Sequence, residues 1–591
     1  MARVVPDVVG LHRTFDYLIP EHLRQQVGVG TIVRIPLHGR KLRGWVVGVG
    51  GPPETDRPLL PLSKVSGLGP PPDLVALSNW AAWRWAGHPT HFLSTASPPR
   101  AVLGLPGAGT SPADSWAEPP PLVAEALRRR LAVVRVPPAS DVYPFLAAAA
   151  GRGNGLVLVP GLEQAAELAD RLRAGGWPVA LMPRDWARAA AGGCLVIGAR
   201  AAAWAPVPDL RTVVVLDEHD EAYQEERSPT WNARDVVVER ARRARVPCLL
   251  VSPVPSLETL NLGPLLTTSR SEERGGWPVV EVVDRRTEPP GSGLYSSRLV
   301  QLVRGAEPGR PVLCVLNRKG RARLLACAAC GELARCEVCD GPMESSDQGL
   351  RCRRCSAERP VVCPACGATR MKALRVGVTR AREELEALAG QPVEEVTAES
   401  GVALAGARVL VGTEAVLHRV RAAGAVAFLD FDQELLATRY RASEEAFGLL
   451  ARAARIVGGR IGGKLLVQTR HPTHEAIDAA VHADPSRLAV VEGARRAALR
   501  FPPETALARI SGQAASELVE ALTQQPGLEV LGPSGPLSGE LGPNGPLSGE
   551  LGPSDDRWLV RAADHATLCD GLAAAGRPRG RVRVEVDPLR A

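Results

Sequence analysis

The sequence predicts an α/β protein with two lobes, each built on a parallel sheet, and three observations lead to this fold class. Apolar runs typical of buried strands recur at 155–161, 194–200 and 212–220, with helical patterns between them. A second series of such runs lies at 311–320, 407–417, 425–431 and 464–469. The chain has 591 residues, more than one hydrophobic core accommodates, so several domains are expected.

Smaller elements flank the two lobes. Residues 1–50 read as short strands, and two β-branched runs joined by the polar turn HGRK predict a hairpin. A helix is expected over 73–87, where Trp80 and Trp83 share a face and are predicted to be core residues. Residues 88–120 are rich in Pro, Ser, Gly and Thr, which is typical of a linker.

The C-terminal end predicts one α+β domain. Its strands are expected in LEVLG and RVRVEVDPL, on either side of a Gly/Pro-rich insertion at 532–554. This insertion repeats a decapeptide, GPSGPLSGEL and then GPNGPLSGEL. Two copies are too few to stack as a solenoid, so the insertion is interpreted as a flexible loop.

These patterns predict five regions. They are an N-terminal β-rich domain (1–100), a linker (101–120), a first α/β lobe (121–270), a second lobe (285–500) with a cysteine-rich insert at 327–366, and the C-terminal domain (501–591).

The composition excludes some classes of protein. A hydrophobic fraction of 45% excludes wholesale disorder. No apolar run reaches 18 residues and the N-terminus has no secretion signal, so we expect a cytoplasmic, nucleoid-associated protein without membrane partners. The net charge of +7 is compatible with nucleic-acid binding. Only five of the 71 cations are lysines, however, and this bias means that arginine abundance alone does not indicate phosphate binding.

The twelve cysteines fall into two groups. Cys194, Cys248, Cys314 and Cys569 are scattered in apolar stretches and are predicted to be buried thiols. The other eight form four CxxC pairs, enough thiolates for two tetrahedral zinc sites. The alternatives are disulfides, which a cytosolic protein rarely contains, and an iron–sulfur cluster.

The spacing of the CxxC pairs favours a nested arrangement. The first two pairs are separated by only five residues, whereas the middle two are separated by twelve, near the usual zinc-ribbon span. One zinc ion is then bound by Cys336, Cys339, Cys352 and Cys355, and the other by Cys327, Cys330, Cys363 and Cys366. Four thiolates leave no position for water, so both sites are predicted to be structural.

Two α/β lobes with a zinc insert are typical of a helicase motor, yet the phosphate-binding loop GxxxxGK[ST] is missing. The only Gly-Lys pair, Gly463-Lys464, is followed by leucine. After the first apolar run of lobe one the chain reads Pro137-Pro138-Ala139-Ser140-Asp141. The two prolines remove amide donors and the aspartate repels phosphate.

Acidic residues follow a strand in VVVLDEHDEAY (213–223). In a motor, Asp217 would hold Mg²⁺ and Glu218 would orient the attacking water. The alternative is an acidic loop at a strand end. Without a phosphate loop we assign no catalytic residue, we interpret Asp217 and Glu218 as vestigial, and we do not expect ATP and Mg²⁺ as cofactors.

Short motifs spread along nearly the whole chain share one resemblance. They are TFDYLIP (14–20), VRIPLHGRK (33–41), VIGARAAAWAPVPDLRTVVVLDEHDEAY (196–223), SPVPSLET (252–259), LNRKG (316–320) before the eight cysteines, VGTEAV (411–416), RASEEAFGLL (441–450), VLGP (530–533) and VEVDP (584–588). Together they resemble the replication-restart family PriA, also called primosomal protein N′.

The chain also departs from that family. Its GVTGSGKT loop is absent, and its arginine-finger segment VAGRAGR is scrambled to ARAARIVGGR (451–460). Residues 88–130 leave little room for the family's winged helix. The sequence is therefore similar to a variant with degenerate helicase motifs that keeps the DNA-recognition and zinc parts.

The resemblance implies two RecA-like superfamily 2 helicase lobes with an inserted two-zinc module, a DNA-binding N-terminal domain and an α+β C-terminal domain. It implies recognition of stalled or abandoned forks and D-loops in DNA repair and recombination, and reloading of the replicative helicase. The implied partners are branched DNA, primosome proteins, the replicative helicase or its loader, and single-stranded DNA-binding protein.

The family holds the 3′ end of a nascent strand in a small pocket. The positions that match it here are Phe15, Asp16, Gly39 and Lys64. A terminal base can stack on Phe15, Asp16 can accept a hydrogen bond from a 3′-hydroxyl, and Lys64 can contact a phosphate. As alternatives, Phe15 is a core residue, Asp16 a turn residue and Lys64 a solvated cation.

Two other functions stay open at this point. One is an active ATP-dependent 3′→5′ DNA helicase with an unorthodox nucleotide site. The other is a protein-only primosome scaffold whose DNA pocket has decayed.

Overall fold

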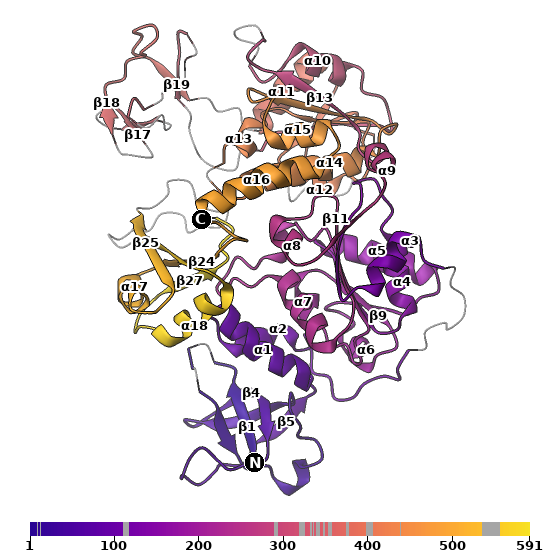
Figure 1. The fold of residues 1–591 in the computed structure, drawn as a ribbon, viewed down its shortest axis with the longest axis vertical. Coiled ribbons are helices and arrows are strands. Elements are labelled where there is room, and N and C mark those ends of the chain that lie inside the picture. The colour runs from indigo at the N-terminus through magenta and orange to yellow at the C-terminus, as the bar shows by residue number, and fades with distance from the viewer. Residues whose placement is uncertain are drawn as a thin grey trace.

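In the computed structural model, the described residues are 1–591 apart from 9, 12, 110–117, 289–292, 318–324, 331, 333, 335, 339–342, 347–348, 353–356, 374–377, 397–405, 438, 535–555 and 591. Figure 1 shows the N-terminal sheet at the lower end, the first α/β lobe above it, the second lobe at the top and the C-terminal sheet beside them. The predicted domain limits remain a prediction.

The N-terminal sheet has the strand order β2-β1-β4-β3-β5. Its strands are β1 (Ala2–Pro6), β2 (Phe15–Tyr17), β3 (Ile32–Leu37), β4 (Arg40–Val49) and β5 (Lys64–Gly67), with a 3₁₀ turn at Glu21–Leu23. The predicted hairpin is β3–β4. Leu37 pairs with Arg40, so the turn consists of only His38 and Gly39, and both have positive φ (49° and 75°). Two consecutive residues with positive φ suit the twist of a tight hairpin.

Two helices follow, where only one was expected. They are α1 (Pro72–Arg84) and α2 (Pro89–Ala96). The prediction of a linker from residue 88 was therefore wrong. The ring of His88 accepts the N–H of Thr90 at the start of α2, and Phe92 lies fully buried against Trp204.

The tryptophans of α1 agree with the prediction only in part. Trp85, one residue beyond the helix end, is fully buried, whereas Trp80 and Trp83 are only half-buried. Trp83 instead donates its Nε1–H to Asp570 on the C-terminal domain, at 2.8 Å. Trp80 packs against the buried core and lies edge-on to Trp85, in agreement with the expectation. The expectation that Trp83 is a core residue was wrong, because Trp83 faces the C-terminal domain.

The first lobe is built on a parallel sheet, as predicted, with the order β12-β6-β11-β10-β7-β9-β8. Its strands are β6 (Leu131–Arg135), β7 (Gly155–Leu158), β8 (Val179–Leu181), β9 (Leu195–Gly198), β10 (Thr212–Leu216), β11 (Cys248–Ser252) and β12 (Leu265–Thr267). Its helices are α3 (Pro121–Arg128), α4 (Tyr143–Gly151), α5 (Leu162–Ala174), α6 (Trp186–Ala191), α7 (Ala233–Ala244), α8 (Leu257–Leu260) and α9 (Arg270–Gly275), with 3₁₀ turns η2 (Arg200–Trp204) and η3 (Glu221–Tyr223).

The second lobe is also parallel, in the order β13-β23-β22-β14-β21-β20. Its strands are β13 (Val279–Asp284), β14 (Val312–Val315), β20 (Val393–Val396), β21 (Val409–Gly412), β22 (Ala425–Phe428) and β23 (Lys464–Thr469). Its helices are α10 (Ser297–Arg304), α11 (Val378–Ala389), α12 (Ala415–Arg419), α13 (Asp432–Leu435), α14 (Ala442–Val457), α15 (Glu475–Val481) and α16 (Pro485–Leu499). The prediction of two parallel-sheet lobes is confirmed.

The cysteine-rich insert contributes short strands between β14 and α11. They are β15 (Leu325–Cys327), β16 (Met343–Ser346), β17 (Gly349–Cys352), β18 (Glu358–Arg359) and β19 (Met371–Ala373). The four scattered cysteines, Cys194, Cys248, Cys314 and Cys569, are all buried, as predicted.

The C-terminal sheet has the order β25-β26-β24-β27. It consists of β24 (Ala506–Ser511), β25 (Leu528–Ser534), β26 (Arg557–Ala562) and β27 (Arg583–Val586), with α17 (Ala515–Thr523) and α18 (His565–Ala575). The predicted strands on either side of the insertion thus share one sheet, while the repeated decapeptide itself lies outside the described residues. No helix in the described part of the chain combines the length and apolar character needed to cross a bilayer.

Candidate functional site: the interface between the lobes and the cysteine cluster

An ion pair joins the two lobes where a helicase-type motor would bind Mg²⁺. Both carboxylate oxygens of Asp217, which follows β10, accept hydrogen bonds from the guanidinium of Arg455 on α14, each at 2.6 Å. The Nε–H of the same arginine points to the carbonyl oxygen of Pro138, at 3.2 Å. Burial opposes ionisation of Asp217, yet Arg455 lowers its pKa to about 2. The carboxylate is therefore ionised and fully engaged by a cation of the protein itself.

A second ion pair lies one helical turn away, and it uses one carboxylate oxygen. Arg452 and Arg455 are three residues apart on α14 and so share a face. Arg452 contacts Asp220, just as Arg455 contacts Asp217. Neither arginine was predicted as a partner of the acidic loop. Their three-residue spacing on a helix, which matches the three-residue spacing of the two aspartates, was the available signal.

The segment that replaces the phosphate-binding loop has few free amide donors. Pro137, Pro138 and Pro144 have no N–H. Four other N–H groups between residues 137 and 145 already have acceptors: Ala139 to Gly276, Ser140 to Pro137, Tyr143 to Asp141 and Phe145 to Val142. Phosphate-binding loops work by pointing several free N–H groups at the anion. This segment therefore lacks the feature that a triphosphate requires.

Asp141 is also engaged. Arg171 on α5 contacts both of its carboxylate oxygens, at 2.7 and 2.6 Å. This hydrogen bonding lowers the pKa of Asp141. Asp141 also accepts the Tyr143 N–H and so stabilises the start of α4. Its carboxylate places a negative charge where phosphate would approach.

Glu218 is enclosed within the first lobe. Its carboxylate is 2% exposed and accepts the Ser256 N–H at 2.8 Å and the Ser256 hydroxyl at 3.0 Å. Thr259 donates its hydroxyl at 2.5 Å, and Arg234 lies at 3.2 Å. With both oxygens engaged, Glu218 fixes the start of α8 and is not free to orient a water molecule.

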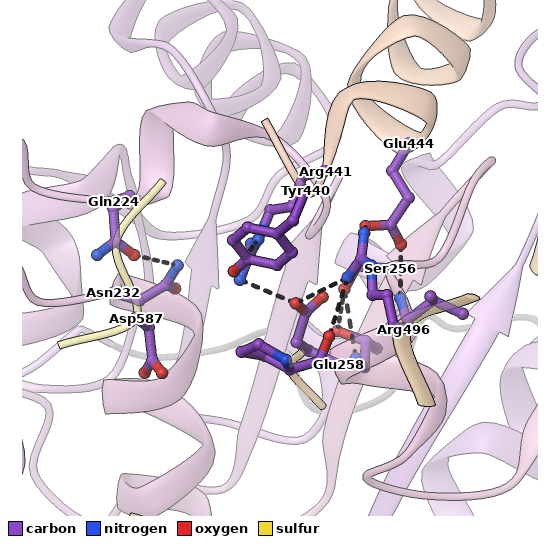
Figure 2. Close-up of polar contacts among 12 residues, drawn as sticks. Gln224, Asn232, Ser256, Glu258, Tyr440, Arg441, Glu444, Arg496 and Asp587 are labelled. Carbon is purple, nitrogen blue, oxygen red and sulfur yellow. Dashed lines mark hydrogen bonds and ion pairs between the residues drawn. The ribbon is translucent and has the colours of Figure 1, made fainter. Parts of the chain in front are cut away.

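Further polar contacts close the interface. Glu258 of α8 lies 2.8 Å from Arg441 and 3.2 Å from Arg496, and Figure 2 shows this carboxylate between the two cations. The guanidinium carbon of each arginine is 5.1 Å from the centre of the Tyr440 ring. The Leu257 N–H donates to Glu444 across the interface at 2.8 Å.

The cavity beside these pairs is small. Its volume is about 130 Å³, and Glu218, Asp220, Arg439, Glu445 and Arg452 are among the residues that line it. Pockets that hold organic ligands typically measure about 300–1,000 Å³. The closed interface therefore offers little room for a nucleotide.

The structure brings together the outer set of predicted cysteines. The sulfur atoms of Cys327, Cys330, Cys363 and Cys366 all lie within 4.8 Å of one another. Cys327 Sγ is 3.5 Å from Cys366 Sγ, and Cys330 Sγ is 3.6 Å from Cys363 Sγ. Tetrahedral zinc with Zn–S bonds of about 2.3 Å needs sulfurs about 3.8 Å apart. These four cysteines could hold a metal ion, and their geometry fits zinc.

The inner predicted set is only partly described. Cys336 and Cys352 are buried in one small cluster with Leu350 and Met343. Cys339 and Cys355 lie outside the described residues. The inner zinc site accordingly remains a prediction.

In the N-terminal domain, Asp16 already has partners. Its side chain is 3% exposed, forms an ion pair with Arg3 at 3.0 Å and accepts the Glu54 N–H at 2.7 Å. Burial favours the neutral carboxyl, but the hydrogen bonds from Arg3 and Glu54 leave the pKa of Asp16 lowered. Asp16 is therefore an ionised acceptor held in a fixed position.

The other three predicted DNA-binding residues lie on different parts of the same sheet. Phe15 packs partly against the domain core, on the face opposite Asp16 because neighbouring strand residues alternate. Gly39 is exposed in the β3–β4 turn, and Lys64 is exposed on β5 opposite Arg34. No hydrogen bond or ion pair joins these four residues to one another, so the assignment of a common pocket stays a prediction.

Comparisons with known proteins agree with this architecture. Residues 3–98 match the 3′DNA-binding domain (3′BD) of PriA. The replication restart protein PriA of Haemophilus influenzae is 28% identical over 389 residues, covering 59% of this chain and 53% of that protein. The probable replication restart protein PriA of Mycobacterium leprae is 29% identical over 424 residues, covering 67% and 65%. That of Mycobacterium tuberculosis is 29% identical over 561 residues, covering 85% of both.

The chain thus spans about half of the first of these relatives and 65% of the second. Among solved structures, Saccharomyces cerevisiae Dbp5 bound to RNA and ADP BeF3 aligns with a TM-score of 0.37 and 11% identity, over 65% of this chain and 94% of that one. Because this score is low, the fold is defined here by the sheet order.

The chain thus combines two parallel-sheet lobes with an N-terminal domain that matches a 3′DNA-binding domain. The chain is similar to replication restart proteins PriA, and the resemblance of its motifs to that family is confirmed.

Proposed function

We propose that this chain is a DNA-structure-binding protein of replication restart that works without ATP turnover. It recognises stalled or abandoned forks and D-loops and promotes reloading of the replicative helicase. The match of residues 3–98 to a 3′DNA-binding domain and the family of the relatives support the DNA-binding part of this proposal.

The observation that carries the absence of ATP turnover is the ion pair between Arg455 and Asp217. In a motor the aspartate of this loop works through Mg²⁺, and an arginine of the opposite lobe contacts the nucleotide phosphates. Here the two side chains satisfy each other. The closed arrangement that a motor reaches with bound nucleotide is thus stabilised by protein groups alone.

The cysteine-rich insert supports a structural role for zinc, with two ions per chain. Cys327, Cys330, Cys363 and Cys366 would hold one ion, which would tie β15 to the segment before β19. The predicted inner set would hold the second. A small insert with few large apolar residues gains much of its folding free energy from such sites.

The proposed partners follow from the family. They are branched DNA with a nascent 3′ end, the primosome proteins, the replicative helicase or its loader, and single-stranded DNA-binding protein. The site of action is the bacterial cytoplasm, at the nucleoid.

A forked DNA substrate tests this proposal. The zinc-loaded protein is expected to bind a fork with a 3′ nascent end with the same affinity in the presence and absence of ATP and Mg²⁺, and to release no phosphate. Fork-stimulated ATP hydrolysis would instead support the active helicase. Equal and weak binding to forked and blunt duplexes would support the protein-only scaffold.

A further inference from the structure

A cavity of about 610 Å³ lies between the N-terminal domain and the first lobe. It is far larger than the cavity between the lobes and falls within the range of organic-ligand pockets. The N-terminal domain contributes segments 29–31 and 68–71 and part of α1, and the first lobe contributes parts of α6 and α7 and segment 206–210. Figure 1 shows α1 beside α7.

Most of its lining is apolar. Leu77, Trp186 and Val207 are each less than 5% exposed to solvent and present carbon-rich surface to the cavity. Leu68 and Leu210 extend this surface. Trp186 uses its one polar group elsewhere, because its Nε1–H donates to the carbonyl oxygen of Ala96 at 2.9 Å.

One buried cation lines this apolar cavity. Arg240 on α7 is 5% exposed, and its Nη1 donates to the carbonyl oxygen of Ala203 at 2.7 Å. Its Nη2 has no hydrogen-bond partner, and among the described residues Arg240 forms no ion pair. Burial lowers the pKa of this guanidinium to about 10, and the charge of Asp73 opposes this shift only in part.

A buried charge without a counter-ion is unfavourable, and proteins normally pair such a group. The neighbouring Arg243 differs, because it pairs with Glu239 at 2.7 Å. Arg240 therefore lines the cavity as a buried cation without a counter-ion from the protein. An anion bound in the cavity would be that counter-ion.

The rim restricts the charge of that anion. Asp73 and Asp209 line the cavity and are exposed to solvent. Two carboxylates at the entrance repel a dianion more strongly than a monoanion. This favours a carboxylate over a phosphate monoester.

We propose that the cavity binds a small organic monocarboxylate, with its carboxylate on Arg240 and its apolar body against Leu77, Trp186 and Val207. Such a ligand would contact both the N-terminal domain and the first lobe. It would therefore stabilise the position of the 3′DNA-binding domain on the rest of the chain.

The test uses the full zinc-loaded chain and two probes of the same shape, 2-naphthoate and its neutral carboxamide, measured by calorimetry. The wild type is expected to bind 2-naphthoate about tenfold or more tightly than the carboxamide, because a hydrogen bond to a charged group is being added. Arg240→Met should abolish this preference, whereas Arg243→Met should retain it.

Ala190→Trp provides a variant that leaves Arg240 intact. Ala190 lines the cavity, so the larger side chain should fill it and weaken the binding of both probes. Equal affinity of the wild type for the two probes, or no binding of either up to millimolar concentration, would overturn the proposal. So would a preference for 2-naphthoate that survives in folded Arg240→Met protein.

Discussion

Arg455 and Asp217 are 238 residues apart in the sequence, yet the guanidinium of the first holds both carboxylate oxygens of the second at 2.6 Å. Asp217 belongs to the first lobe and Arg455 to the second, so this ion pair holds the two lobes together. Arg452 and Asp220 form the adjacent pair. Two parallel-sheet lobes can in this way be held together without a nucleotide.

Removal of the cation should loosen this interface. Arg455→Met leaves Asp217 buried without its partner and should lower the free energy of unfolding by about 1–3 kcal/mol, less than for a fully buried pair because Arg455 is 38% exposed. Urea unfolding measures this change. Arg460→Met, on the same segment but without an ion pair among the described residues, should change it little.

The double variant gives the sharper result. Asp217→Asn combined with Arg455→Met removes both charges, so its loss of stability should be smaller than the sum of the two single losses. Additive losses would contradict a direct pair.

Glu445 should make the interface sensitive to pH. Burial and the negative charge of Glu221 across the interface raise the pKa of Glu445 to about 8. Arg439, 2.6 Å away, opposes this shift. Glu434 also faces Arg439. The pKa of an unfolded glutamate is about 4.3, so between these two pH values the folded state holds a proton that the unfolded state lacks. This contribution to stability is complete below about pH 4.3 and is lost as the pH rises through 8.

Urea unfolding at pH 5 and pH 8 checks this sign. The wild type should lose more stability over this interval than Glu445→Gln. Glu163→Gln, at a side chain that is 72% exposed, serves as the matched control and should keep the wild-type slope. A steeper slope for Glu445→Gln than for the wild type would refute the assignment.

Zinc content can be tied to particular thiols. The wild type should carry two zinc ions per chain by elemental analysis, and Cys363→Ala should carry one, because a three-thiolate site binds more weakly. Cys194→Ala, at a buried thiol of the first lobe, should keep both. A full zinc content in Cys363→Ala would rule out the outer site.

The 3′ end is the proposed ligand of Asp16. Asp16→Asn should reduce the preference for a 3′-hydroxyl over a 3′-phosphate end by about tenfold, the effect of one hydrogen bond to a charged group. Glu21→Gln, at an exposed carboxylate of the same domain, should keep that preference. Because Asp16 also pairs with Arg3, circular dichroism should first establish that the variant is folded.

Local patterns in the sequence predicted the sheets better than the interfaces. Apolar runs such as GLVLVPG became buried parallel strands because such strands are covered on both faces. Helix α2 was missed because its Pro-, Ser- and Thr-rich surroundings mask the apolar residues Phe92 and Leu93. Trp83 was misjudged because helical spacing predicts that a face is covered but not which domain covers it.

In the candidate site, too, local features could be predicted from the sequence and contacts between the lobes could not. The spacing of the CxxC pairs was enough to predict which four thiols lie together in the outer set. The missing phosphate loop was evident from Pro137 and Pro138. The partner of Asp217 was not, since a contact between distant helices and strands depends on how the lobes pack.

Whether the protein binds nucleotide at all can be measured by calorimetry, with a nonhydrolysable ATP analogue and Mg²⁺ added to the zinc-loaded wild type in the presence and absence of forked DNA. We expect no saturable binding up to millimolar analogue in either case, together with undiminished fork binding. Saturable micromolar binding that requires Asp217 and is strengthened by the fork would contradict this expectation.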